Sequence, residues 1–180
     1  MYGVIDFYKE CIKQGVKPII GIETYVAPNS HLDREGMRDY AHLILLAKNE
    51  QGYRNLIKLS SIAFVDGFYY RPRIDYDLLE KHCEGLICLS ACIAGDIPQH
   101  LLSGQDEKAK ALALRLKGMF GDDFYIELQN HGLPEQLEVL PKLAALAKEL
   151  DIKTVATNDI HYVDKDDAEA QDMLLCIQTL

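Results

Sequence analysis

Asp159 and His161, close to the end of the sequence, have the types and the spacing of a metal-binding pair. They follow the apolar run KTVAT at residues 153–157, and residues two apart in an extended segment point to the same side. A carboxylate and an imidazole together suit zinc, manganese or iron. An Asx turn followed by a surface histidine would give the same pattern, so both interpretations stay open at this point.

Three more residues of metal-ligand type lie in or beside apolar runs. Glu23 falls within the run at residues 16–26, His42 begins HLILLA, and Cys92 follows GLICLS. A carboxylate in an apolar strand needs a partner, because burial of an unpaired charge is costly. Each residue also has an ordinary interpretation: Glu23 as a solvent-facing strand end, His42 as a hydrogen-bonded structural residue, and Cys92 as a small buried hydrophobe.

The sequence contains none of the common alternative catalytic motifs. A P-loop, a dinucleotide-binding fingerprint, a nucleophile elbow and a paired-cysteine zinc motif are all lacking. Metal-assisted chemistry is therefore the favoured catalytic option. We expect His131, which follows the run FYIEL, to shape a loop and not to act as a ligand.

Alternating strands and helices must position these side chains. β-rich apolar runs predict strands at about residues 17–26, 42–47, 85–90, 124–128 and 153–157. Helical spacing predicts helices at about 4–14, 51–64, 75–82, 105–119, 134–150 and 165–177, with a kink or restart at Pro141. This alternation predicts an α/β fold of parallel units, whose strands carry working residues at their carboxyl ends. About five parallel strands are too few for a complete eight-stranded barrel.

Composition limits the class of protein. A chain of 180 residues with 48% hydrophobic and 26% charged residues predicts one globular domain over residues 1–180. The net charge of −9 excludes a broad phosphate-binding surface, so any contact with nucleic acid must be local or metal-assisted. Five cysteines without a CxxC motif argue against a disulfide framework and a zinc ribbon. Since the sequence has neither a membrane-length apolar run nor a secretion signal at its start, we expect a cytoplasmic protein.

Six blocks of the sequence together resemble one family, the polymerase and histidinol phosphatase (PHP) domain of bacterial DNA polymerase III alpha subunits. The blocks are GVKPIIGIETYVA, HLILLAKNEQGYRNLIKLSSIAF, GFYYRPRID, EGLICLSACIAGDIP, FYIELQNHGLPEQ and VATNDIHYVDKDDAEAQDMLLCIQT. This resemblance implies a distorted, TIM-like β/α barrel with seven strands and nine metal-ligand positions. Five of those positions match residues of this chain: Glu23, His42, Cys92, Asp159 and His161.

The amino end departs from the family pattern. Family members begin with a strand that carries His-x-His and continue to a second strand that ends in Asp-His-Gly, and neither motif occurs here. We therefore expect a truncated PHP domain, an incomplete barrel cut from a much longer polymerase chain. About four ligands would be lacking, so zinc or manganese should bind to the intact domain and weakly or not at all to this fragment, which should be inactive alone.

The resemblance also implies a function in DNA replication. The parent protein would be a DNA-directed DNA polymerase, a nucleotidyltransferase, with a metal-dependent phosphoesterase in this domain that resembles a 3'-5' proofreading exonuclease. Glu23, Asp159 and His161 would be its catalytic residues. The expected partners are the rest of the polymerase chain, the separate proofreading exonuclease subunit, and DNA in the parent complex, with no membrane.

Two alternatives stay open. The domain could be a non-catalytic docking module for the proofreading exonuclease subunit. It could also be a stand-alone PHP phosphatase, but the blocks GFYYRPRID and NHGLPEQ argue against this because they resemble polymerase sequences.

Overall fold

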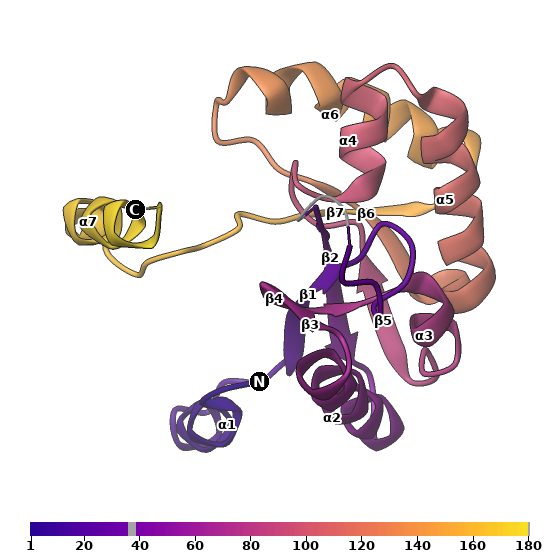
Figure 1. Cartoon of the computed structure of the whole chain (residues 1–180). Helices are drawn as coiled ribbons and strands as arrows, with labels where there is room; N and C mark the ends of the chain where they lie inside the picture. The colour runs from indigo at the N-terminus through magenta and orange to yellow at the C-terminus, as the bar shows by residue number, and fades with distance from the viewer. Residues whose placement is uncertain (36–38, 180) are drawn as a thin grey trace.

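The computed structural model describes residues 1–35 and 39–179, which form one sheet with helices packed against it (Figure 1). The sheet has seven strands in the order β3-β4-β1-β2-β5-β6-β7. They are β1 (Gly21–Val26), β2 (Ala41–Ala47), β3 (Phe68–Tyr69), β4 (Arg71–Ile74), β5 (Leu86–Leu89), β6 (Phe124–Leu128) and β7 (Lys153–Ala156). The sheet ends at β3 and β7, as expected for an incomplete barrel.

The helices lie close to their expected positions. They are α1 (Val4–Lys13), α2 (Glu50–Val65), α3 (Tyr76–Glu80), α4 (Asp96–Leu102), α5 (Asp106–Phe120), α6 (Pro134–Glu149) and α7 (Ala168–Thr179), with short 3-10 helices at Gly121–Asp123 and Lys165–Asp167. The sequence did not predict α4, which has only seven residues. We expected a kink or a restart at Pro141, but helix α6 runs through this residue without a restart. A proline at that position removes one backbone hydrogen bond but leaves the rest of the helix paired.

Strand directions confirm the α/β class and correct one detail. Strands β1, β4, β5, β6 and β7 run in one direction, whereas β2 and β3 run in the opposite direction. Five strands are therefore parallel, but β2 was wrongly included among them and β4 was missed. Among the described residues, no helix separates β1 from β2. Parallel neighbours need a long crossover, usually helical, so the chain returns antiparallel beside β1.

The pairing of β1 with β2 gives the sheet two different faces. Leu43 and Leu45 of β2 are buried, and they belong to the same core as Leu56 and Leu59 of α2. Side chains alternate along a strand, so His42 lies on the opposite face. Glu23 shares that opposite face, because it lies across from Ile44, the second residue after His42. The core thus fixes which side chains the open face presents.

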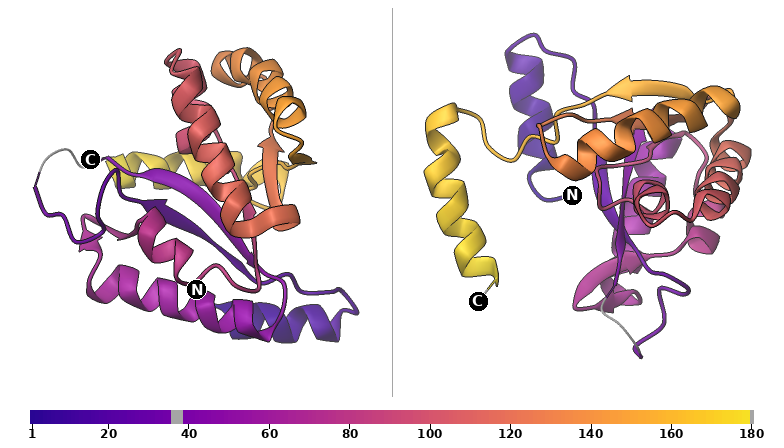
Figure 2. Two further views of the ribbon diagram at one scale, coloured as in Figure 1. Left: turned by 90° about the vertical axis from the view of Figure 1, so that its right-hand side faces the viewer. Right: turned by 90° about the horizontal axis from the view of Figure 1, so that it is seen from above.

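Two helices contribute little to this core. Helix α1 has no buried residue, and its Ile5 and Ile12 are 55% and 56% exposed. Figure 1 shows α7 apart from the other elements, and the view from above in Figure 2 agrees. Ile177 of α7 is 71% exposed. Within the part of the chain that the structure describes, no helix is long and apolar enough to cross a membrane.

Candidate metal centre

The antiparallel direction of β2 brings His42 to the edge of the sheet where the parallel strands end. His42 lies opposite Tyr25, the second-last residue of β1. Its backbone N–H donates to the carbonyl of Ala94, 3.0 Å away, in the loop that follows β5. The amino end of β2 is therefore fixed between the carboxyl ends of β1 and β5, which the strand-end rule for parallel sheets could not predict.

Three of the five candidate ligands meet at this edge. One ligand atom from each of Glu23, His42 and Cys92 lies within 4.8 Å of the other two. His42 Nδ1 is 2.6 Å from Glu23 Oε1 and 3.6 Å from Cys92 Sγ. A carboxylate, an imidazole and a thiolate from three different segments form a donor set that fits a divalent transition metal. We call these three residues the ligand triad.

Within the ligand triad, His42 and Glu23 each shift the pKa of the other. Its contacts with the Cys92 sulfur and with the Glu23 carboxylate raise the pKa of His42 to about 10, and burial opposes them. The His42 hydrogen bond in turn lowers the pKa of Glu23. The imidazole is thus protonated at neutral pH when no cation is bound. A metal ion takes the place of such a proton, so metal binding at the triad should release it.

Asp159 and His161 lie outside the ligand triad but face the same space. Both line a hollow of about 500 Å³ together with Cys92. The charge of His161 also contributes to the lowered pKa of Glu23. Their side chains are 31% and 59% exposed, and His161 Nδ1 donates to the backbone carbonyl of Asp159 at 2.8 Å. The predicted pair is therefore adjacent to the triad without joining it.

His131 shapes the neighbouring loop, as the sequence predicted. Its Nε2–H donates to the carbonyl of Asn158 at 2.7 Å, and its Nδ1 accepts from the Gln136 amide at 2.9 Å. Both ring nitrogens are occupied, so His131 has no free lone pair for a metal. It anchors the segment that leads to Asp159.

Three polar residues behind the centre were missed by the sequence interpretation. Glu127 and Gln129 of the β6 region are 4% and 9% exposed, and Thr157 donates its hydroxyl to Glu127 Oε1 at 2.6 Å. Burial raises the pKa of the Glu127 carboxyl, while hydrogen bonds from Thr157 and the Ala91 N–H oppose that shift. Glu127 is a carboxylate inside the apolar run FYIEL and therefore needs a partner, which is the argument that drew attention to Glu23.

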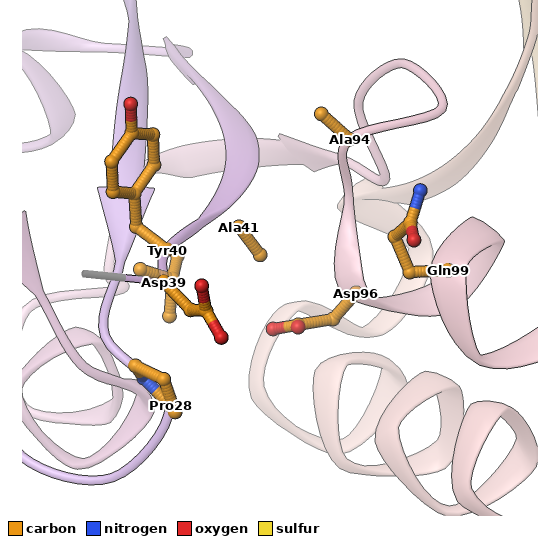
Figure 3. A pocket seen from close by; sticks show the side chains of 8 residues that line it. Pro28, Asp39, Tyr40, Ala41, Ala94, Asp96 and Gln99 are labelled. Carbon is orange, nitrogen blue, oxygen red and sulfur yellow. The ribbon is translucent and has the colours of Figure 1, made fainter. Parts of the chain in front are cut away.

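A second hollow, of about 540 Å³, is lined by Ala41 and Ala94, among other residues (Figure 3). Ala41 precedes His42 and Ala94 follows Cys92 by two residues, so this hollow lies beside the triad. The carboxylates of Asp39 and Asp96 point toward one another across it in Figure 3. Tyr40 turns its ring away from this hollow and stacks on His42, with ring centroids 6.2 Å apart. Two carboxylates disfavour a phosphate. The hollow lined by Cys92 and His161 has one aspartate, Asp159, in its lining.

Comparison with known proteins finds one family model and several similar polymerase subunits. A family model described as "PHP domain" matches residues 1–131. A protein named DNA polymerase III subunit alpha from Treponema pallidum is 51% identical, and one of the same name from Borreliella burgdorferi is 54% identical. A third, from Thermus aquaticus, is 47% identical. Each alignment covers 99% of this chain but only 15% or 16% of the relative, so the chain spans a small part of their length.

Proposed function

This chain belongs to the PHP domain family, and from that premise we propose that it is a metal-dependent phosphodiesterase module of a bacterial replicative DNA polymerase. The family match and the similarity to DNA polymerase III alpha subunits confirm the resemblance expected from the motifs. One observation carries the proposal. Three ligand-type side chains from separate segments place their donor atoms within 4.8 Å of one another, at the edge where parallel strands end.

The ligand triad would hold a divalent metal, and Asp159 with His161 would complete the site from across the shared hollow. Among the metals expected from the sequence, the Cys92 thiolate favours zinc, because soft ligands select it over manganese. When bound, such ions activate a water molecule and neutralise charge on a phosphate. This agrees with a chain of net charge −9, which has no broad basic surface of its own.

The chain's own residues have separable tasks in this proposal. Glu23 and His42 hold each other in place through their 2.6 Å contact. Tyr40 supports the His42 ring by stacking. Asp159 and His161 lie on the exposed side, where they can reach a substrate phosphate. We assign the catalytic role to Glu23, Asp159 and His161.

We further propose that the protein acts in DNA replication in the cytoplasm. Its nucleotidyltransferase chemistry would depend on residues outside this chain. Its partners would be the remainder of the polymerase, the separate proofreading exonuclease subunit and DNA. The isolated 180 residues should bind little metal and cleave no DNA, and robust chelator-sensitive cleavage by them alone would overturn that expectation.

The test uses the full-length protein that contains this chain. Bound metal is measured together with 3'-5' degradation of primed DNA, for the wild type and for Asp159→Asn and His161→Ala. We expect bound zinc or manganese in the wild type and degradation lowered about 100-fold or more in both variants. Nucleotide addition by the same samples serves as the control and should be unchanged.

Two results would contradict the phosphodiesterase proposal. The wild type could bind no metal, or both variants could degrade DNA as fast as the wild type. If the metal-free protein still captured the proofreading exonuclease subunit in a pull-down, the docking alternative would replace the catalytic one.

A further inference from the structure

Glu127 occupies a central place between the two loops of the candidate centre. It lies in β6, which pairs with β5 on one side and β7 on the other. The loop after β5 carries Cys92, and the segment after β7 carries Asp159 and His161. Glu127 is nevertheless 4% exposed and lies outside the ligand triad, so it has no role as a ligand in the proposed chemistry.

On one side Glu127 fixes the loop that carries Cys92. Its backbone N–H donates to Ser90 Oγ at 2.9 Å. The Ala91 N–H faces its carboxyl and lowers the pKa of that group, against the effect of burial. Ala91 has a φ of 65°, a left-handed conformation that is unfavourable for a residue with a Cβ. Strained backbone of this kind persists only where its surroundings hold it, and it is common at functional sites. Glu127 supplies part of that restraint one residue before Cys92.

On the other side Glu127 fixes the segment that leads to Asp159. Thr157 Oγ1 donates to Glu127 Oε1 at 2.6 Å. The Gln129 amide donates to the same Thr157 oxygen at 3.0 Å. Thr157 precedes Asp159 by two residues, so this short chain of hydrogen bonds sets where the segment leaves β7.

The arrangement carries a cost in stability that the core does not require. Glu127 Oε2 and Gln129 Oε1 are buried without a hydrogen-bond partner among the described residues. Such buried atoms are destabilising, and they concentrate where function demands them. Glu127, Gln129 and Cys92 all line one cavity of about 10 Å³, so the two residues with unsatisfied atoms lie next to the candidate ligand.

We propose that Glu127 is a positioning residue that aligns the Cys92 loop and the Asp159–His161 segment on a single metal centre. The identity of the ligands rests on the proposed function, but the contacts that define the positioning role do not. Loss of the Glu127 side chain should loosen both loops together.

Hydrogen-exchange mass spectrometry of the full-length protein tests this directly. Glu127→Ala should speed amide exchange about tenfold in residues 157–162, which lose the Thr157 hydrogen bond, and in residues 90–95, whose Ala91 N–H loses the facing carboxylate. Glu127→Gln should stay close to the wild type, since an amide oxygen can still accept from Thr157 and face the Ala91 N–H.

Two further variants separate positioning from general destabilisation. Thr157→Val removes one link and should loosen only residues 157–162. Asn55→Ala is the matched control. Asn55 lies in α2 and, like Glu127, is a buried polar residue, 7% exposed, and its amide donates to the carbonyl of Glu84. It should leave both loops unchanged. Equal exchange in Glu127→Ala and wild type, or equal effects of Glu127→Ala and Asn55→Ala on both loops, would overturn the inference.

Cobalt(II) titration provides the second measurement, because a cobalt–thiolate bond absorbs light. Glu127→Ala should lower cobalt affinity about 10- to 100-fold, as removal of supporting partners around metal ligands does, and Glu127→Gln should restore most of it. Equal affinity in Glu127→Ala and wild type would refute the positioning role while leaving the metal centre intact. A wild type without cobalt binding would instead refute the proposed function, and hydrogen exchange would then decide the role of Glu127.

Discussion

The candidate centre has two parts that the fold holds in different ways. Glu23, His42 and Cys92 come from segments joined by backbone pairing, and their contacts are 2.6 and 3.6 Å. Asp159 and His161 lie on a segment after the edge strand β7, and their ligand atoms are 4.0 Å apart. Sheet pairing therefore prepares the first part in advance, whereas the second part depends on a few anchoring hydrogen bonds.

This difference follows from burial. Leu45, in the middle of β2, is fully buried, whereas Ile160, between Asp159 and His161, is 77% exposed. The segment after β7 is anchored by the Thr157 bond to Glu127 and by the His131 bond to Asn158. Because it has few anchors and little burial, this segment should open more easily than the strands that carry the triad.

The largest loss of stability should come from truncating a core side chain of β2, the strand that carries His42. Leu45→Ala should lower the free energy of unfolding by about 2–5 kcal/mol, the range for a buried leucine. Ile160→Ala should change it by less than about 0.5 kcal/mol, because the side chain is exposed. Urea unfolding of the two variants measures the difference, and equal losses would contradict the contrast between the two parts.

The next largest loss of stability should come from adding a Cβ at Gly95, in the loop that carries Cys92. A Cβ at Gly95 would lie 2.3 Å from the carbonyl oxygen of Ser90 and 3.2 Å from that of Cys92. Gly95→Ala should therefore destabilise the chain by about 1–3 kcal/mol and displace the Cys92 loop from β2. Thermal unfolding and cobalt binding report the two consequences.

Gly118→Ala is the matched control for that substitution. It lies inside α5, and an added Cβ would meet nothing within 4 Å. It should leave cobalt binding unchanged and stabilise the helix by up to about 1 kcal/mol. A Gly95→Ala variant as stable as Gly118→Ala would show that the loop tolerates displacement.

In the presence of a chelator, the free energy of unfolding should depend on pH through the protonation of His42 in the ligand triad. The folded pKa of His42 is raised to about 10, so its stabilising contribution is complete below its unfolded pKa, about 6.5, and disappears as the pH rises to about 10. The stability difference between wild type and His42→Gln should shrink over that interval. Cys92→Ala should reduce the slope, because the Cys92 contact is the largest cause of the shift. Parallel curves for wild type and His42→Gln would contradict the coupling.

Much of this architecture could be predicted from residue patterns. The apolar runs located five strands, although not the direction of β2. The residue pattern alone left Glu23, Cys92, Asp159 and His161 with ordinary interpretations as well, and the family resemblance singled them out as ligands. The position of His42 could not be predicted in the same way, because it depends on the antiparallel direction of β2. A connection from β1 without a helical pattern was the available signal.

The remaining features were too short or too indirect for a pattern. Strands β3 and β4 have two and four residues, and they turn at Tyr70, which has a φ of 61°. The role of Glu127 depends on two loops that are far apart in sequence and meet only in the folded sheet. No local periodicity carries that information.

Cobalt(II) binding by the full-length protein tests the central claim, that Glu23, His42 and Cys92 form a metal centre. The wild type should show the absorption of a cobalt–thiolate bond, and Cys92→Ala should abolish it. Cys88→Ala is the matched control, because Cys88 is fully buried in β5 outside the triad, and it should retain the absorption. A wild type without this absorption, or a Cys92→Ala variant that keeps it, would contradict the account.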